Sequence, residues 1–202
     1  MKKKRSHLQK RLYVLTLVCL VPLTILIIYL LILLGRFSDR YNAITDNITM
    51  ANTYSIHFKE NMDYTMYTII VNMARAEELT GMQQPHAMID KARKDFRTLY
   101  HLTDSEYARS QISGILKCLN TLEDRVEEIE ADALVSGTYD KNMERLDLNI
   151  RVLTDLIQER IQEFIYVETT HLETLREGIR GDVSTALRTC IIIFTVILAG
   201  SV

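Results

Sequence analysis

Two uncharged, apolar runs bracket a charged middle, and they constrain this chain more than any other feature. Residues 12–34 form the first run, 23 residues without a charge, and a second run begins at Cys190 and reaches Val202. At the helical rise the first run extends about 35 Å, enough to cross a hydrocarbon core of about 30 Å. We therefore predict a transmembrane helix over residues 12–34 and the start of a second one over residues 189–202.

The second run is too short to cross the same core. As a helix it would extend only about 20 Å. A helix that stops within lipid leaves backbone groups without partners, so we expect the natural protein to continue past Val202. In this interpretation the chain is a truncated part of a longer membrane protein.

Charge at the N-terminus predicts the orientation. Six basic residues and no acidic residue precede the first run, namely Lys2, Lys3, Lys4, Arg5, Lys10 and Arg11. Such a cluster keeps residues 1–11 in the cytoplasm and places residues 35–188 outside the cell membrane. A cleaved signal peptide is the competing interpretation, but its apolar core would be shorter, and Gly35-Arg36-Phe37 does not form a small-residue cleavage pattern.

The outer region is acidic. Residues 36–188 hold all 26 acidic residues and 18 basic ones, a net charge of −8, and no basic patch is visible. This argues against nucleic acid as a partner, because phosphates need clustered Lys and Arg. The basic residues at the N-terminus are better explained by the orientation of the chain in the membrane and by contact with anionic lipid. Only Cys118 falls in the outer region, where we expect a small core residue, with a cross-subunit disulfide as the alternative.

Periodicity predicts an all-α fold. Apolar residues of the outer region recur every three or four positions, and Pro85 is its only proline. One helix should continue from the membrane to near Gly81, a second should run from Pro85 to near Leu102, and a third should end near Gly137. A fourth should open at Tyr139 and run unbroken into the second apolar run.

The expected core follows from the apolar stripes of these helices. A capping box of Thr103 and Glu106 should start the third helix. The stripes consist of Tyr41, Ile44, Ile48, Ala51, Phe58, Met62, Met66, Ile69 and Met73, then Met88, Ala92, Phe96 and Leu99, then Ile112, Ile115, Leu119, Leu122, Val126, Ile129 and Ala133, and finally Met143, Leu146, Ile150, Leu153, Ile157, Ile161, Phe164, Leu175, Ile179 and Val183.

Helix lengths predict an elongated extracytoplasmic four-helix bundle with long first and last helices. The second helix should rise only about 24 Å, so four helices should overlap only far from the membrane. Near the membrane, residues 36–58 and 157–188 should run as two helices whose apolar stripes face water. We expect a second subunit to cover them, which gives a parallel homodimer.

Motifs of chemistry are missing from the sequence. It contains no glycine-rich phosphate loop, no paired-cysteine zinc pattern and no nucleophilic serine elbow, so we assign no catalytic, cofactor-binding or metal-binding residue. His57, His86 and His101 are expected to be solvated or capping residues, because their spacing does not suit a metal. His171 faintly resembles a phosphoacceptor box, but its acid is displaced and it would lie outside, away from ATP.

Two polar groups deserve a structural test. The acidic run of residues 123–130 is interrupted by stripe residues, which is typical of a solvated helix face, with a cation site as the minority interpretation. Aromatic and cationic residues of the first two helices are the other group, and a membrane-distal bundle could gather them around a small anion, although surface placement is the simpler expectation. They are Tyr54, Tyr64, Tyr67, Arg75, Arg93 and Arg97.

A resemblance adds a functional expectation. The layout of residues 1–202 resembles the N-terminal membrane and outer region of sensor histidine kinases of the YesM-like class from Gram-positive bacteria. The amino-acid sequence of residues 41–67 (YNAITDNITMANTYSIHFKENMDYTMY) resembles the same region. The resemblance implies a longer parent with a HAMP linker, a phosphoacceptor domain and an ATP-binding kinase domain that needs ATP and Mg. It also implies a response regulator as partner and an unknown extracytoplasmic ligand or protein as signal.

The function expected from these features is that of a signal-input module. A ligand would bias two packings of the outer helices, and the last helix would pass the shift through the membrane as a piston, tilt or rotation. Gly178 and Gly181 are a possible hinge in that helix. The input module of a chemotaxis receptor shares this layout, and a structural membrane hairpin without a signal is the alternative from another class.

Overall fold

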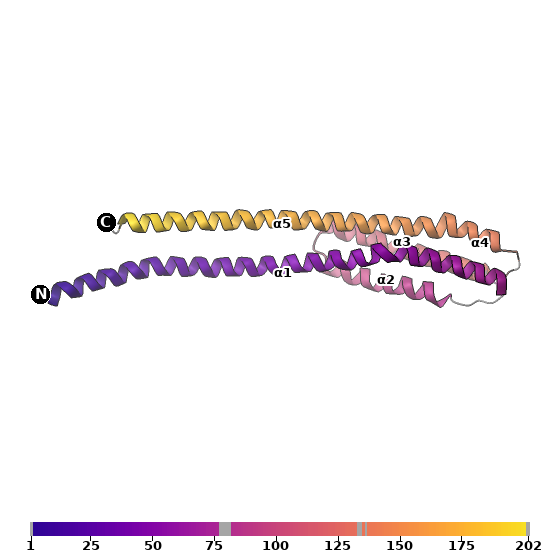
Figure 1. The fold of residues 1–202 in the computed structure, drawn as a ribbon, viewed down its shortest axis with the longest axis horizontal. Coiled ribbons are helices and arrows are strands. Elements are labelled where there is room, and N and C mark those ends of the chain that lie inside the picture. The colour runs from indigo at the N-terminus through magenta and orange to yellow at the C-terminus, as the bar shows by residue number, and fades with distance from the viewer. Residues whose placement is uncertain (1, 77–81, 133–134, 136, 201–202) are drawn as a thin grey trace. The chain divides into compact units, whose positions relative to one another are not determined.

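The structure, a computed structural model, describes residues 2–76, 82–132, 135 and 137–200. Helices are the only regular elements in these ranges, and no strand occurs in them, so the all-α prediction is confirmed. The elements are α1 (Lys2–Ala76), α2 (Gln83–Leu102), α3 (Glu106–Asp132), α4 (Tyr139–Arg145), the π-helical η1 (Leu146–Ile150) and α5 (Arg151–Gly200), as Figure 1 shows.

The chain forms two compact units, and the predicted domain limits, which concern the membrane, stay a prediction. One unit is Ala43–His171, and the other combines Met1–Asn42 with Leu172–Val202. The limits of the two units follow contacts between backbone segments, whereas the predicted domain limits at residues 11, 34 and 188 follow hydropathy. The two criteria differ because a helix can leave a packed core several turns before its composition becomes apolar.

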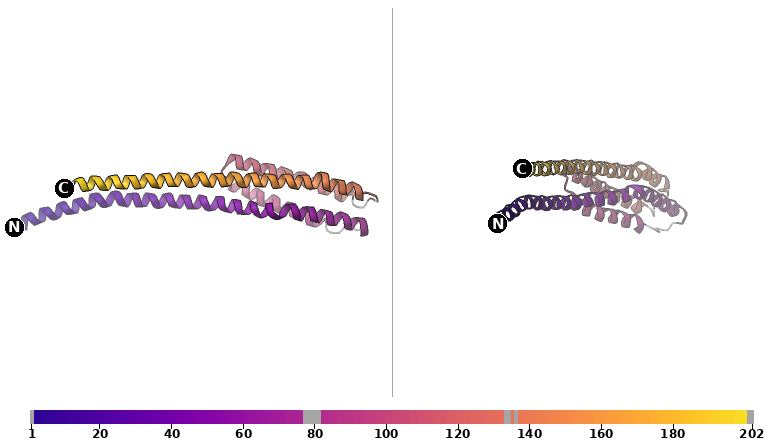
Figure 2. Two further views of the ribbon diagram at one scale, coloured as in Figure 1. Left: turned by 45° about the horizontal axis from the view of Figure 1, so that its top comes forward. Right: turned by 60° about the vertical axis from the view of Figure 1, so that its left-hand side comes forward.

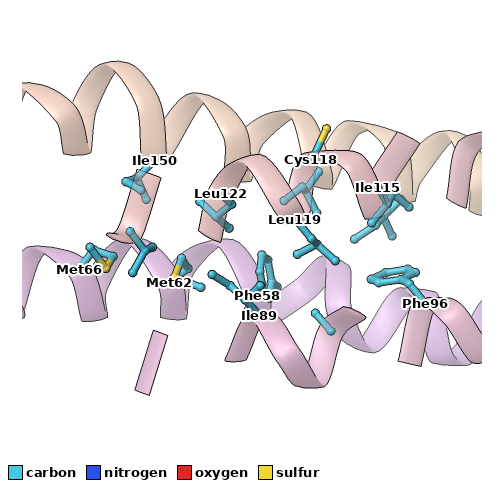
Figure 3. Close-up of a cluster of buried hydrophobic side chains, with 14 of the residues drawn as sticks. Phe58, Met62, Met66, Ile89, Phe96, Ile115, Cys118, Leu119, Leu122 and Ile150 are labelled. Carbon is cyan, nitrogen blue, oxygen red and sulfur yellow. The ribbon is translucent and has the colours of Figure 1, made fainter. Parts of the chain in front are cut away.

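The unit Ala43–His171 has one hydrophobic core, to which α1, α2, α3 and the α4–η1–α5 segment all contribute. Figure 3 shows Phe58 and Met62 of α1 pointing toward Ile89 of α2 and Leu119 of α3. Most stripe predictions for this unit are confirmed, and Cys118 is buried in the core as expected. Ile89 was missed, although it is fully buried, while its predicted neighbour Met88 only packs against the core edge.

Helices α2 and α3 cover more of α1 and α5 than the helix lengths predicted. Tyr54 of α1 packs on Phe96 of α2 with ring centroids 5.1 Å apart, and Tyr107 of α3 donates to Glu163 of α5 at 3.2 Å. The expected two-helix stretch of residues 36–58 and 157–188 is therefore too long. The estimate was wrong because α2 has 20 residues and rises about 30 Å instead of about 24 Å.

A glycine of α3 gives the side chain of Arg160 of α5 room against the α3 backbone. A Cβ added at Gly114 would lie 2.8 Å from Nη1 of Arg160, so only glycine lets this guanidinium lie against the α3 backbone. Nη1 of Arg160 also donates to Oε1 of Gln111 at 3.3 Å. The side chain therefore spans the α3–α5 interface.

The connection between α2 and α3 differs from the predicted capping box. Oγ1 of Thr103 donates to the carbonyl of Leu99 at 2.8 Å, which ends α2, and the Thr103 carbonyl accepts from Arg109 Nε at 2.6 Å. The N-cap of α3 is instead Ser105, whose Oγ accepts from the backbone N–H of Ala108 at 3.3 Å. The box was wrong because Thr103 already serves the end of the preceding helix.

Other predicted boundaries have mixed outcomes. The end of α2 at Leu102 and the start of α4 at Tyr139 are confirmed. Gly137 has φ of +84°, a conformation that favours glycine, and it lies just before α4. The predicted end of the first helix near Gly81, and the predicted core residue Ala133, lie outside the described residues.

The last helix was expected to be α-helical throughout, but the structure shows an interruption. Between α4 and α5 the backbone forms the π-helical segment η1, with i→i+5 hydrogen bonds. The buried residues here follow one another at intervals of four, at Asn142, Leu146, Ile150 and Thr154. A step of four residues exceeds the helical repeat of 3.6, so three such steps would turn the buried stripe away from the core of an α-helix. The wider π-helical turn brings the stripe back toward the core.

In the second unit, the N-terminal part of α1 and the C-terminal part of α5 run side by side in opposite directions, as Figures 1 and 2 show. Each contributes one half-buried stripe, with Leu26, Leu30, Leu33 and Phe37 on α1 and Leu175, Ile179, Cys190 and Ile193 on α5. Apolar residues on the outer faces remain exposed, including Leu31 at 64%, Ile192 at 63% and Phe194 at 66%. Tyr41 and Val183, predicted as stripe residues, are also exposed.

One helix of the described chain is long and apolar enough to cross a membrane, by length and composition. It is the stretch Leu20–Ala74 of α1, whose most apolar 18 residues have none buried inside the structure. Side chains beyond Thr195 lie outside the described residues. The second predicted span is therefore only partly described.

Candidate ligand-binding groove

A polar groove lies between α2 and α3, in the unit Ala43–His171. It has a volume of about 550 Å³, within the usual range for small-ligand sites. Helix α2 lines it with residues spaced three or four apart, which share one helix face, and α3 contributes two more. The lining residues are Asp90, Arg93, Lys94, Arg97, Thr98, His101, Asn120 and Glu123.

Arg93 forms the fixed wall of the groove. Its Nη1 donates to Oδ1 of Asp90 at 2.7 Å, its Nε donates to Oδ1 of Asn120 at 3.2 Å, and its Nη2 donates to Glu123. The side chain is only 14% exposed. Two carboxylates thus neutralise this guanidinium, which joins α2 to α3 and has little charge left for a ligand.

Lys94 and Arg97 are the cations that a ligand can reach. Both are exposed on α2, one turn apart, and neither takes part in an ion pair within the described part of the chain. Helix α2 carries four basic and two acidic residues, in contrast to the acidic outer region as a whole. Because exposed guanidinium and ammonium groups form charge-assisted hydrogen bonds with oxyanions, the groove suits a small anion.

The anion pocket suggested by sequence is only partly assembled. Arg93 and Arg97 line the same groove, but the tyrosines do not join them. Tyr54 donates its hydroxyl to Asp95, and burial together with this carboxylate raises its pKa well above the ordinary value. Tyr64 and Tyr67 are 72% and 43% exposed, and the side chain of Arg75 lies outside the described residues.

The acidic face of α3 is paired as well as solvated. Val126 and Ile129 are buried, as their interruption of the acidic run predicts. Two of the carboxylates, however, contact side chains of α2, since Glu123 pairs with Arg93 and Nε2 of His86 lies 3.2 Å from Oε2 of Glu130. The sequence interpretation of His86 as a merely solvated or capping residue therefore missed a bridge between α2 and α3.

The remaining histidines are placed near the surface. His57 and His101 are exposed, and His171 is half-buried on α5. Among the residues that the structure describes, no group of three or more His, Cys, Asp or Glu side chains is arranged to hold a metal ion. The geometry therefore directs attention to anion binding and to buried polar groups.

Glu168 is a buried carboxyl that sequence analysis did not single out. It is 2% exposed on α5, and its Oε1 has no hydrogen-bond partner. Burial raises its pKa, His171 opposes this rise, and Asp104 adds to it. A detectable signal was its position, because Glu168 lies four residues after the core residue Phe164 and continues the apolar spacing of α5.

Comparisons with protein-family models, with curated proteins and with solved structures found no match for the chain. The exposed side chains of Lys94 and Arg97, next to the ion pair of Arg93 with Glu123, give the groove a surface that suits recognition of a small ligand.

Proposed function

We propose that this chain is the signal-input module of a two-pass membrane sensor histidine kinase. In the proposed topology residues 1–11 are cytoplasmic, residues 12–34 cross the membrane, residues 35–188 form an extracytoplasmic four-helix bundle, and residues 189–202 begin the return through the membrane. The proposed output is a cytoplasmic kinase encoded beyond these residues, which acts on a response regulator.

One observation carries the proposal. The helix α5 begins at Arg151, contributes Ile157, Ile161 and Phe164 to the buried core, and continues as one helix to Gly200 in the second apolar run. A continuous helix transmits a displacement of its packed part along its whole length, because its backbone hydrogen bonds resist local bending. This is the property that a transmembrane signalling element needs.

The groove between α2 and α3 supplies an entry point for the signal. In the proposed mechanism a small anion binds Lys94 and Arg97, and the α2–α3 pair then favours one of two packings against α1 and α5. The ion pair of Arg93 with Glu123 and its hydrogen bond to Asn120 hold α2 and α3 together, so a change on α2 reaches α3. Substituting Arg97 by Gln should abolish the response while leaving folding intact, since Arg97 is exposed.

Topology can be tested by labelling single cysteines in a variant whose three native cysteines are replaced by alanine. An impermeant maleimide added to whole cells should label Glu177→Cys, outside, and should not label Ser6→Cys until the cells are opened. Labelling of Ser6→Cys in intact cells, or protection of Glu177→Cys, would contradict the proposed orientation.

The output is tested by reading the coding sequence that follows the codon of Val202. A HAMP-like pair of helices followed by a histidine box and ATP-binding motifs is the expected result. A long methylatable coiled coil would instead identify a chemotaxis receptor, and a prompt stop codon would identify a structural hairpin. Either of these two results rejects the kinase.

Transmission through α5 has its own test in the parent receptor. A Gly-Pro insertion between Gly178 and Gly181 breaks the helix, because proline removes a backbone hydrogen bond and clashes with the preceding turn. Output should then no longer follow the ligand. A parent that still responds normally with this insertion would rule out transmission through the helix.

A further inference from the structure

A second groove lies within the unit formed by Met1–Asn42 and Leu172–Val202, where the two helices leave a gap in their stripe. Its volume is about 590 Å³. Helix α1 lines it with Leu33, Arg36, Phe37, Asp39 and Arg40, and α5 lines it with Leu175, Gly178, Ile179 and Asp182. The groove thus begins at the last turn of the apolar run of residues 12–34 and extends into the charged region.

The groove has an apolar floor and a charged rim. The apolar side chains, Leu33 and Phe37 from α1 and Leu175 and Ile179 from α5, are half-buried. All four charged side chains are exposed, and none of them takes part in an ion pair within the described ranges. They comprise two cations, Arg36 and Arg40, and two anions, Asp39 and Asp182.

Arg36 and Arg40 lie four residues apart, so they are neighbours on one face of α1, about 5–6 Å apart at Cβ. Two guanidinium groups in this arrangement can share one phosphate, for which their planar donors are well suited. The carboxylates of Asp39 and Asp182 complement an ammonium group near that phosphate. Together the rim matches a headgroup that carries one charge of each sign.

We propose that this groove binds one zwitterionic aminophospholipid, with phosphatidylethanolamine as its chemical type. The phosphate lies between Arg36 and Arg40, the ammonium group meets Asp39 and Asp182, and the start of an acyl chain covers Phe37 and Ile179. This assignment rests on the proposed membrane topology, which places the groove at the outer interface between lipid and water.

Two properties of the groove favour a lipid over a second copy of the chain or a soluble anion. Its floor continues the apolar run, whose exposed side chains need hydrocarbon around them, so an acyl chain extends one continuous apolar surface. The rim has no net charge, whereas a site for a free anion would carry an excess of cations. A lipid headgroup with both charges satisfies all four side chains at once.

Gly178 provides a sharp test, because it is the lining residue without a side chain. A Cβ at Gly178 would meet no atom within 4 Å, so Gly178→Leu fills the groove without a clash. Gly181 has equally open surroundings on the same helix but does not line the groove, and Gly181→Leu is therefore the matched control. Both substitutions replace a glycine of α5 by the same residue, so they change helix propensity to the same extent.

The measurement is native mass spectrometry of the full chain in detergent, titrated with phosphatidylethanolamine or with phosphatidylglycerol. The parent chain and Gly181→Leu should retain one phosphatidylethanolamine. Gly178→Leu should bind it about tenfold more weakly because the leucine side chain occupies the groove. The pair Arg36→Gln and Arg40→Gln should weaken binding by a similar factor, since the charge-assisted hydrogen bonds to the phosphate are lost. The pair Arg176→Gln and Arg180→Gln, four residues apart on α5 outside the groove, is the charge control.

Equal retention by the two glycine variants would overturn the assignment, and so would tighter binding of phosphatidylglycerol. A shift from dimer to monomer in Gly178→Leu, with lipid retention unchanged, would identify a second copy as the occupant and also overturn it. The maleimide labelling of Glu177→Cys in the same cells separates this failure from a failure of the proposed function. If the labelling is as expected and no lipid is retained, only the lipid assignment is wrong.

Discussion

Two carboxyl groups of the unit Ala43–His171 have surroundings that shift their pKa values in opposite directions. Burial without a partner for one oxygen raises the pKa of Glu168. Hydrogen bonds from Lys141 at 2.7 Å and from Arg145 at 2.6 Å lower the pKa of Asp132. The stability of the chain should therefore depend on pH in two separable ways.

Glu168→Gln should remove one of these dependences. Because the folded chain holds this proton more tightly, the contribution of Glu168 is fully present below its ordinary pKa of 4.5 and is lost as the pH rises through the folded-state pKa. The melting temperature of the variant should thus exceed that of the parent by a growing margin, a few degrees, as the pH rises. Thermal melts followed by circular dichroism measure this, with the exposed Glu159→Gln as control.

Asp132→Asn should show the opposite pH dependence. The stabilisation by Asp132 is present above its ordinary pKa of 3.8 and is lost as the pH falls through the lower folded-state pKa. The variant should melt below the parent at neutral pH, and the difference should vanish in strong acid. Asp124→Asn, an exposed carboxylate of α3, should have no such effect, and a difference that persists at low pH would contradict the assignment.

At the scale of elements, η1 is the most informative segment. Buried residues before and through it occur at intervals of four, from Asn142 to Thr154, and then change to alternating intervals of three and four. The segment from Asn142 to Thr154 therefore contains one residue more than a regular buried stripe of an α-helix requires. The π-helical turn accommodates this residue at the surface, where Leu148 is 62% exposed.

Deleting Leu148 should convert η1 into regular α-helix. The buried positions from Asn142 onward would then alternate between steps of four and three, and the core contacts of Leu146 and Ile150 would be kept. Deleting Glu159, which is exposed within regular helix, should rotate one part of α5 by about 100° against the other and expose core residues. Thermal melts should show a much smaller loss for the first deletion, and equal losses would refute the extra-residue explanation.

A polar link between α1 and α5 is a second element-scale feature. Nζ of Lys59 lies 2.8 Å from Oδ1 of Asp155 and 3.1 Å from Oδ2 of Asp63, whose other oxygen accepts from Thr154 at 2.9 Å. Partial desolvation lowers the pKa of Lys59, but the hydrogen bonds to both carboxylates outweigh it and raise the pKa overall. These contacts favour one alignment of α1 against α5 next to η1.

A double-mutant cycle on Lys59 and Asp155 should give a small coupling. Asp155 is 64% exposed, so water screens the pair, and we expect at most about 1 kcal/mol from Lys59→Met and Asp155→Asn measured by chemical denaturation. Added salt should reduce the coupling further. A coupling of several kcal/mol, or one insensitive to salt, would show that the pair is less solvated than described.

At the scale of the whole molecule, burial within one chain changes how the proposed homodimer should be tested. Ile44 is 8% exposed and faces the core of its own chain, whereas Val183 is 37% exposed and does not line the proposed lipid groove. Coverage by α2 and α3 also leaves less apolar stripe for a partner than the helix lengths suggested. The remaining candidate contact lies among residues 36–42 and 172–188.

Single cysteines should therefore behave differently in membranes. In a background without native cysteines, Val183→Cys should give disulfide-linked dimers on mild oxidation, and Ile44→Cys should give few. The reason is that a side chain buried within its own chain cannot reach a second one. If a membrane-embedded sample forms no dimer through Val183→Cys, the homodimer is rejected.

Much of the fold was predictable from individual segments. The stripe of α3 from Ile112 to Ile129 was predicted residue by residue, and each of its named members in that range is fully buried. The spacing that revealed it depends only on the helical repeat, which every segment carries in its own sequence. The candidate site was less predictable, because surface placement was the simpler expectation for Arg93, whereas its side chain is 14% exposed and pairs with Glu123 of α3.

The sequence by itself determined that this chain is helical, which residues form its apolar stripes, and that α1 contains a segment able to cross a membrane. Only the tertiary structure decided how far α2 and α3 cover the long helices, that Glu168 is buried, and that Arg93 is neutralised by Glu123. The physical reason is the separation along the chain of the residues that each feature involves. Helical periodicity is local, whereas the partner of a given side chain depends on the register between segments that are distant in the chain.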